Sequence, residues 1–197
     1  MTDAKPPQTV SAPKDEGADL AHQPPRAERP IVLVGLMGAG KSTVGRRLAN
    51  MMDYDFVDAD DAIEEAAQRS IPEIFEEFGE AYFRDGERRV IARLMDERCG
   101  VIATGGGAFV DPQTRALILE RGLAVWIDCD IDTLVERTAR RDHRPLLKTG
   151  NPREILTRLH TERKPAYSQA HIRVQSDDGP HDDTAQAIVR EIKEWQG

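Results

Sequence analysis

Short apolar runs alternate with longer stretches of helical periodicity along the chain after Pro30. Continuous apolar runs of this length are typical of strands that are buried on both faces of a sheet. We expect strands at 31–34, 56–57, 101–103, 124–127 and 171–174. We expect helices at 43–52, from 70 through 78, at 81–98, after 112, at 131–141, ahead of 167 and at the end of the chain. Because helices separate the strands, the pattern predicts an α/β fold with a five-stranded parallel sheet flanked by helices.

Local signals mark where several of these helices begin. Ser70 and Glu73 have the spacing of a capping box, and Asp111 stands before a proline at the start of another helix. In the last helix, helical spacing places one set of apolar residues on a single face, and we expect that face to pack into the core. The set consists of Ala185, Ile188, Val189, Ile192 and Trp195.

The first 29 residues differ in composition from the rest of the chain. They are rich in proline, alanine and mixed charge, and they contain no aromatic residue and no periodic pattern. Such a segment buries too little apolar surface to offset the entropy of ordering it. We therefore predict a disordered tail over 1–29 and one domain over 30–197. A tail that docks onto a partner is the alternative.

Charge and composition narrow the classes of function. The net charge of −8 disfavours nucleic acid as the main partner, because phosphate backbones attract basic surfaces. No run approaches the ~18 consecutive apolar residues of a membrane span, and the N-terminus has no signal-peptide core. Cys99 and Cys129 lack metal-binding or redox spacing, so we expect reduced structural thiols. Together these observations predict a cytoplasmic protein with no nucleic-acid or membrane partner.

Residues 35–42 carry the most specific chemical signal. Their sequence GLMGAGKS fits the phosphate-binding pattern GxxxxGK[ST] and directly follows the apolar run 31–34. Glycines let backbone N–H groups converge on an anion, and the next helix adds a favourable dipole. Lys41 is placed to reach the β- and γ-phosphates, and the Ser42 hydroxyl to bind Mg²⁺. This context predicts a nucleoside triphosphate site in a P-loop NTPase fold; a plain glycine-rich turn before a helix is the alternative.

Further polar signals fall near the ends of other expected strands, where ligands gather in parallel sheets. Asp58 and Asp60 alternate, so in an extended backbone their side chains would point apart, one toward Mg²⁺ and the other toward a hydroxyl acceptor. The glycine run 105–107 offers backbone N–H groups at close range to a ligand. Arg84 and Arg163 are each suited to paired hydrogen bonds with a carboxylate or phosphate.

Each of these signals also has a plainer interpretation. Asp58 and Asp60 fit a solvated strand end or a helix N-cap. Arg84 with Glu87 fits an ion pair at i, i+3 on a helix surface. The glycine run fits a flexible turn. The basic stretch 140–144 fits a solvated helix end that complements the dipole, and Arg163 with Lys164 fits the same interpretation on another helix.

Taken together, these residues resemble the shikimate kinase family. The resemblance extends over nearly everything from residue 31 to the end of the chain and leaves the N-terminal tail outside. The first matching segment fits many P-loop kinases, whereas the six segments in this order are much more specific. They are GLMGAGKSTVGRRLA at 35–49, DAD at 58–60, FRDGE at 83–87, TGGGA at 104–108, RPLL at 144–147 and RKPAY at 163–167.

The resemblance implies a nucleoside monophosphate kinase-like fold and assigns ligands to residues. Shikimate would be bound by Asp60, Arg84, Gly105, Gly106, Gly107 and Arg163. Both arginines would contact its carboxylate, Asp60 would contact ring hydroxyls, and Glu87 would orient Arg84. ATP would be bound by Gly38, Ala39, Gly40, Lys41, Ser42, Thr43, Arg137, Arg144 and Pro180.

The same resemblance indicates which residues would contact the metal ion and the adenine ring. Ser42 would bind Mg²⁺ directly, and Asp58 would lie near the ion and contact it through water. Arg137 and Pro180 would flank the adenine ring. These residues are all present in the chain, so the resemblance implies ATP and Mg²⁺ as its required small molecules.

A lid over the phosphates is also implied, at about 140–152. Arg144 would lie in this lid and reach the phosphates on closure, although Arg140 and Arg141 are further candidates for that contact. The chain departs from the family pattern at Ala166, where leucine is usual. We expect this change to alter packing near Arg163 rather than its charge.

The implied activity is that of an ATP:shikimate 3-phosphotransferase, which makes shikimate 3-phosphate and ADP on the route to chorismate and aromatic amino acids. Lys41, Asp60 and Arg144 would be the catalytic residues, and family analogy favours a monomer. A gluconate-type kinase would leave FRDGE and RKPAY unexplained, and a nucleoside monophosphate kinase would need a base-binding segment that is not evident. A catalytically silent ATP-dependent interaction module would be expected to lack Lys41, Asp60 or the lid arginines, which are present.

Overall fold

Parallel strands form the centre of the molecule. The computed structural model describes residues 29–97, 100–139 and 150–196. Within these residues the sheet has the strand order β2-β3-β1-β4-β5, and every neighbouring pair is parallel. The strands are β1 (Ile31–Val34), β2 (Phe56–Asp58), β3 (Val101–Ala103), β4 (Leu123–Cys129) and β5 (Ile172–Ser176). The predicted five-stranded parallel sheet is confirmed.

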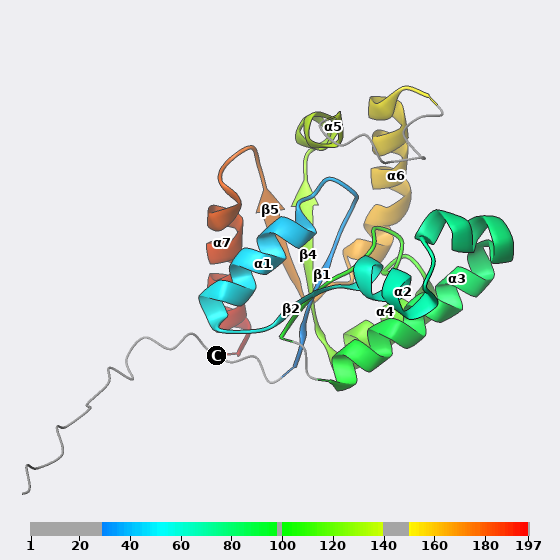
Figure 1. Cartoon of the computed structure of the whole chain (residues 1–197). Helices are drawn as coiled ribbons and strands as arrows, with labels where there is room; N and C mark the ends of the chain where they lie inside the picture. Colours follow the sequence, from blue (N-terminus) through cyan, green and yellow to red (C-terminus); the bar gives the residue numbers. More distant parts are fainter. Residues whose placement is uncertain (1–28, 98–99, 140–149, 197) are drawn as a thin grey trace, which may run out of the picture.

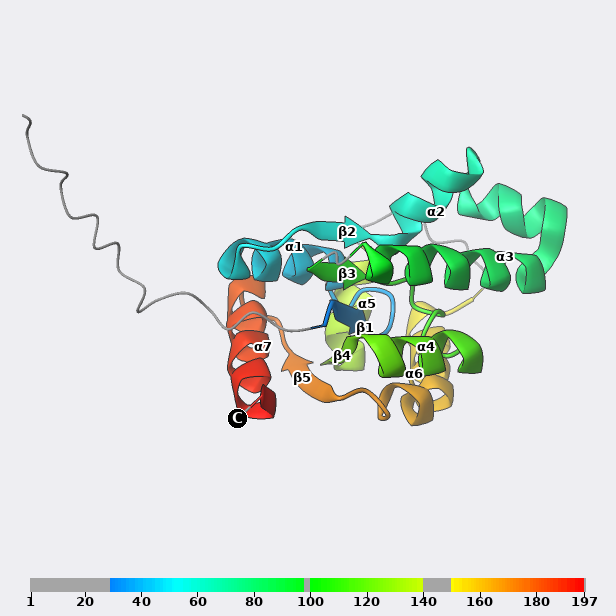
Figure 2. The ribbon, with the colours of Figure 1, turned by 90° about the horizontal axis from the view of Figure 1, so that it is seen from below.

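Helices cover both faces of this sheet. They are α1 (Lys41–Met52), α2 (Ala59–Ala67), α3 (Ile71–Asp96), α4 (Pro112–Arg121), α5 (Ile131–Ala139), α6 (Pro152–Tyr167) and α7 (His181–Gln196). Helices α1 and α7 lie on one side of the sheet, and α3, α4 and α6 lie on the other (Figure 2). Every residue of β1, β3 and β4 is therefore buried, which explains their continuous apolar sequences.

The carboxyl ends of the strands define the end of the molecule where a ligand site is expected. In Figure 1, β4 and β5 point toward α5, and the loop that joins β1 to α1 lies at that same end. Helix α2, which directly follows β2, and the loop after β3 also begin at this edge, because all the strands are parallel. The topology thus gathers segments that are far apart in the sequence around one edge of the sheet.

Helix α3 contains the two helices that were expected at 70–78 and 81–98. They meet at a kink at Gly79, whose φ of 78° and ψ of 175° are not helical. The predicted capping box at its start is confirmed, with Glu73 Oε2 accepting a hydrogen bond of 2.8 Å from Ser70 N. A residue without Cβ tolerates this positive φ, so Gly79 allows the chain to change direction between the two helical segments.

The expectation that Trp195 packs into the core is wrong. Ala185, Ile188 and Ile192 on α7 are fully buried, whereas Trp195 keeps 47% of its surface exposed. Its ring lies against His171, with a centroid separation of 5.8 Å. The apolar stripe therefore leaves the core before the last turn of the helix, where the sheet no longer covers it.

Cys129 is a free, buried thiol at the end of β4. Burial raises the pKa of Cys129 to about 11, which keeps the thiol protonated at neutral pH and fits the expected structural role. Cys99 and residues 1–28 of the tail expected over 1–29 lie outside the described residues. Among the helices of the described ranges, none is long and apolar enough to cross a bilayer.

His171 gives the fold a pH-dependent contact at the opposite end from the strand carboxyl ends. Its Nδ1 accepts a hydrogen bond of 3.0 Å from Ala124 N, so the ring must be neutral at that nitrogen. Burial, assisted by the positive charge of Arg29, lowers the pKa of His171 from its ordinary value of 6.5. The contact therefore stabilises the fold fully above pH 6.5 and is lost as the pH falls through the lower folded-state pKa.

We expect this linkage to be visible in chemical unfolding curves. The contribution of His171 to the free energy of unfolding should decline as the pH falls below about 6.5, while the raised pKa of Asp60 acts in the opposite direction. His171→Asn retains an acceptor near the Nδ1 position but does not titrate, so this decline should be absent. Urea titrations of both proteins at several pH values measure the difference. If the free energies of unfolding of the two proteins changed with pH in parallel, protonation of His171 would not be coupled to folding.

Candidate functional site

The loop between β1 and α1 has the geometry of an anion-binding site. Gly38 and Gly40 have positive φ angles of 87° and 93°, and α1 begins at the next residue, Lys41. The Lys41 ammonium is nearly buried and donates hydrogen bonds to Gly35 O at 2.8 Å and Leu36 O at 2.9 Å. Its positive charge thus lies over the loop that ends at the N-terminus of α1. The predicted strand, glycine loop and helix are all present in that order.

Asp58 links this loop to the end of β2. Its Oδ2 accepts a hydrogen bond of 2.6 Å from Ser42 Oγ, and its Oδ1 accepts one of 3.1 Å from Asp60 N. Asp58 is therefore the N-cap of α2, and Asp60 lies in the first helical turn. The expectation that both carboxylates project from extended backbone is wrong. The two carboxylates still point in different directions, because Asp58 contacts Ser42 whereas Asp60 lies beside Gly105 in the loop after β3.

The pairing of Ser42 with Asp58 fits the requirements of Mg²⁺. That ion prefers oxygen ligands and is commonly held by one or two protein groups together with phosphate oxygens and water. A hydroxyl and a carboxylate within hydrogen-bond distance, beside an anion-binding loop, provide such a set. In the described parts of the chain, no three or more His, Cys, Asp or Glu residues gather as an all-protein metal site.

Asp60 lies in an environment that opposes its negative charge. Burial raises the pKa of Asp60 to about 6, the neighbouring charge of Asp58 adds to the shift, and Lys41 opposes it. A Cβ added at Gly105 would lie 2.7 Å from Asp60 Oδ1 and 3.3 Å from Glu87 Oε1. The absence of a side chain at Gly105 therefore makes room for two carboxylates.

The three glycines after β3 each face a different functional side chain. Gly105 faces Asp60, a Cβ at Gly106 would lie 3.6 Å from Arg163 Nη1, and a Cβ at Gly107 would overlap the Arg84 guanidinium. The approaches at Gly105 and Gly107 require a residue without a side chain, whereas 3.6 Å at Gly106 is an ordinary contact distance. A merely flexible turn would not need glycine at these two positions for close contact. The glycine loop is thus the place where side chains from α2, α3 and α6 converge.

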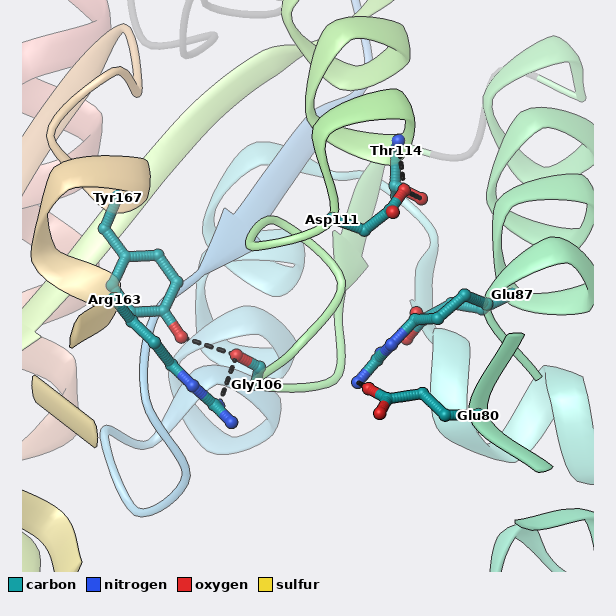
Figure 3. A network of polar contacts seen from close by, with 8 residues as sticks. Glu80, Glu87, Gly106, Asp111, Thr114, Arg163 and Tyr167 are labelled. Atoms are coloured by element: carbon teal, nitrogen blue, oxygen red, sulfur yellow. Dashed lines mark hydrogen bonds and ion pairs between the residues drawn. The ribbon is translucent and has the colours of Figure 1, made fainter. Parts of the chain in front are cut away.

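Arg84 is held by carboxylates on its own helix. Its Nη1 lies 2.6 Å from Glu87 Oε2, and its Nη2 lies 3.4 Å from Glu80 Oε1. Glu87 is only 1% exposed, so the interpretation of an ordinary surface pair is wrong. Burial raises the pKa of Glu87, although the Arg84 guanidinium opposes the shift. Figure 3 shows Glu80 and Glu87 directed toward the same space in front of α3.

Arg163 approaches the glycine loop from the other side, on α6. Its Nη1 donates a hydrogen bond of 3.0 Å to Gly106 O, and Tyr167 Oη donates one of 2.5 Å to the same oxygen. Both side chains point toward Gly106 in Figure 3. Arg163 and Glu87 therefore lie on opposite sides of one glycine loop. Two guanidinium groups, from α3 and α6, face a common space with Asp60 beside it.

A cavity of about 320 Å³ lies beside the anion-binding loop, away from the glycine loop. It is lined by Glu136, Arg137, Asp178, Gly179 and His181. Arg137 donates to Ser176 Oγ at 3.3 Å and to the Asp177 carbonyl, and the His181 ring lies against Gly40. This arrangement provides a partly charged pocket next to the anion-binding loop, as a nucleotide base would require.

Comparison with known protein families gives a match along most of the chain. The sequence model of shikimate kinase matches residues 37–193. The chain belongs to the shikimate kinase family. The match includes the anion-binding loop from its third residue, the Asp58 segment, the glycine loop and both arginine-bearing helices.

Individual shikimate kinases resemble the chain over most of its length. Shikimate kinase of Novosphingobium aromaticivorans is 63% identical over 176 residues, which cover 86% of this chain and 90% of that protein. Shikimate kinase of Caulobacter vibrioides is 52% identical over 176 residues, with coverage of 89% and 86%. The structure of shikimate kinase from Acinetobacter baumannii in complex with shikimate superimposes with a TM-score of 0.79 at 38% identity, over 86% of this chain and 95% of that chain.

Most of the residues that the shikimate kinase resemblance assigned fall into these two neighbouring spaces. Pro180 is exposed and does not line the cavity, although Gly179 and His181 on either side of it do. Arg144 and the lid segment 140–149 lie outside the described residues. Asn151 caps α6, so the last expected lid residue, Pro152, belongs to that helix.

Sequence reasoning missed several residues at this site. Tyr167 contacts Gly106 O, a role that the sequence did not predict, and its place at the end of the segment RKPAY is the available signal. His181, Glu136 and Asp178 line the cavity without belonging to any of the six segments. Their positions depend on how α5 and α7 pack beside the loop, which no local pattern encodes.

Proposed function

We propose that the chain transfers the γ-phosphate of ATP to the 3-hydroxyl of shikimate, giving shikimate 3-phosphate and ADP. Membership of the shikimate kinase family identifies the activity. The observation that carries the residue assignments is the convergence of Asp60, Arg84 and Arg163 on one glycine loop beside the Lys41 loop. That arrangement suits an acceptor with one carboxylate and several hydroxyls, facing the phosphate to be transferred.

Phosphoryl transfer requires positioning and charge neutralisation more than covalent chemistry from the protein. The N–H groups of residues 38–43 would hold the phosphates at the start of α1. Lys41 would leave the carbonyls that it now contacts, or share its hydrogen bonds with them, and bind the moving phosphoryl group. Its charge would then stabilise the negative charge on the transferred group and on the leaving oxygen.

Ser42 and Asp58 would hold Mg²⁺, with Ser42 as a direct ligand and Asp58 as a contact through water. Bound together with the nucleotide, the ion would neutralise negative charge on the phosphates. The 2.6 Å hydrogen bond between the two side chains already places their oxygens together. The same bond keeps the end of β2 close to the start of α1, so it also aligns the acceptor side with the donor side.

On the acceptor side, the two arginines would bind the carboxylate and Asp60 the hydroxyls. Arg84 would approach from α3, where Glu87 fixes its guanidinium, and Arg163 from α6, where Gly106 O fixes it. The 3-hydroxyl oxygen forms a bond to the γ-phosphorus as the bond to the ADP oxygen breaks. Asp60 would orient that hydroxyl and accept its proton.

The cavity beside the loop would receive the base of the nucleotide. Arg137 lines it and would flank the adenine, and the exposed Pro180 would contact the ring from outside. Arg144, in a lid at about 140–152, would reach the phosphates when both substrates are bound. Closure would exclude water, which competes with shikimate as the acceptor. We also infer that the protein acts as a cytoplasmic monomer without nucleic-acid or membrane partners.

The test is ADP release with Mg·ATP and a panel of acceptors. Shikimate should support turnover, while gluconate, AMP, CMP and the absence of an acceptor should give background rates. Turnover with gluconate would support a sugar-acid kinase, and turnover with AMP or CMP a nucleoside monophosphate kinase. Nucleotide binding without turnover on any acceptor would support a silent interaction module and contradict the proposal.

Gly107→Ala should weaken shikimate binding, because the added methyl group would displace the Arg84 guanidinium. Loss of a hydrogen bond from a charged group weakens binding enough to raise KM for shikimate about tenfold. KM for ATP should change little. Gly86→Ala is the matched control, because Gly86 lies two residues from Arg84 on α3 and a Cβ there would have no neighbour within 4 Å. Equal KM values in the two variants would contradict the role of the close approach.

A further inference from the structure

The carbonyl oxygen of Gly106 is the acceptor for two side chains of α6. Arg163 Nη1 lies 3.0 Å and Tyr167 Oη 2.5 Å from this oxygen (Figure 3). A carbonyl oxygen has two lone pairs, so the two donors saturate it. The bonds span 57 and 61 residues of sequence, and they join the glycine loop to the helix that carries Arg163.

The Gly106 carbonyl requires an external restraint. Its residue stands between Gly105 and Gly107, and a chain of glycines has few steric limits on its backbone angles. The peptide is planar, so fixing the carbonyl also fixes the direction of the Gly107 N–H. Whatever holds this oxygen therefore sets the orientation of the peptide at the centre of the acceptor site.

Tyr167 is well suited to provide the restraint. Its side chain is only 1% exposed and its ring stacks on Trp126 of β4, with centroids 5.9 Å apart. Burial raises the pKa of Tyr167 to about 12, so the hydroxyl stays protonated and donates at any physiological pH. A rigid aromatic ring anchored on the sheet fixes the donor more firmly than a long flexible side chain does.

We propose that Tyr167 is a positioning residue for shikimate. Its hydroxyl fixes the Gly106 carbonyl, and that carbonyl in turn fixes the guanidinium of Arg163. Arg163 uses Nη1 on this anchor, and a guanidinium has further N–H groups with which it would bind the carboxylate of the acceptor. The inference rests on the proposed function, and it predicts that loss of one hydroxyl affects one substrate selectively.

Tyr167→Phe removes the hydroxyl and keeps the ring that packs on Trp126. Loss of one hydrogen bond to the anchor should raise KM and the calorimetric dissociation constant for shikimate by about 3- to 10-fold. KM for ATP and kcat at saturating shikimate should stay close to those of the unmodified protein. Ser168→Ala is the matched control: it removes the next hydroxyl, which donates to Pro165 O at 3.2 Å on the exposed side.

A double-mutant cycle separates positioning from general stabilisation. Because Tyr167 acts through the anchor of Arg163, the effect of Tyr167→Phe on KM for shikimate should be smaller in the Arg163→Lys protein than in the unmodified one. A lower melting temperature, together with a lower kcat and KM values raised equally for shikimate and ATP, would assign Tyr167 a structural role and overturn the inference. An unchanged KM for shikimate in Tyr167→Phe would overturn it as well.

The same assay distinguishes this failure from failure of the proposed function. If the unmodified protein does not phosphorylate shikimate, the proposed function fails and the inference fails with it. If the unmodified protein is active and Tyr167→Phe has the same KM for shikimate, only the positioning role is wrong.

Discussion

Replacing Lys41 by methionine is expected to lower kcat by about 100-fold or more, the scale for losing one preorganised donor to the transition state. The ammonium lies at the loop that would hold the phosphates, where its hydrogen bonds to Gly35 O and Leu36 O keep it nearly buried. Methionine preserves the length of the side chain but carries no charge. Steady-state rates of shikimate-dependent ADP release, measured at saturating substrates, give the change in kcat directly.

Arg46→Met is the control for that experiment. It removes a positive charge from the exposed side of the same helix, where the guanidinium lies over the ring of Phe56 at 4.9 Å. This variant should turn over like the unmodified protein. Melting temperatures of both variants show whether the loss of the Lys41 hydrogen bonds has unfolded the loop region. A folded Lys41→Met protein with normal turnover would remove Lys41 from the mechanism.

Arg163→Ala is expected to raise KM for shikimate by about 10- to 100-fold, because a hydrogen-bonded charge pair with the carboxylate would be lost. The carboxylate of the acceptor does not change charge during the transfer. Its partner therefore contributes equally to binding in the ground state and in the transition state. We expect a much smaller change in kcat once shikimate is saturating. Initial rates across a wide range of shikimate concentrations separate the two parameters.

Lys164→Ala provides the comparison for Arg163. Lys164 is the next residue of α6 and is exposed, so its removal changes the local charge by the same amount without touching the glycine loop. KM for shikimate should be almost unaffected in this protein. A large loss of kcat in Arg163→Ala with an unchanged KM would contradict the assigned role, as would equal KM values in the two variants.

Local sequence patterns were sufficient where one segment determines its own structure. The loop at 35–42 is specified by glycines that permit positive φ and by the strand and helix on either side, so both its shape and its chemistry were predicted. The capping box at Ser70 and the N-cap at Asp111 are likewise local, and both are present. The parallel sheet followed from apolar runs separated by helical stretches.

Patterns failed where the outcome depends on distant packing. Asp58 ends a strand and caps a helix, and its bond to Ser42, sixteen residues away, depends on how the end of β2 packs against the start of α1. Trp195 continues the apolar spacing of α7 beyond the region that the sheet covers. Tyr167 acquires its contact from a loop 61 residues away, so its position in a quoted segment did not indicate its partner.

A crystal structure of the protein with shikimate and Mg·ADP tests the central claim most directly. The account predicts that the shikimate carboxylate lies between the guanidinium groups of Arg84 and Arg163. It also predicts that the 3-hydroxyl lies within hydrogen-bond distance of Asp60, on the side that faces Lys41. Shikimate bound away from the glycine loop, or with its carboxylate in contact with neither arginine, would contradict the account.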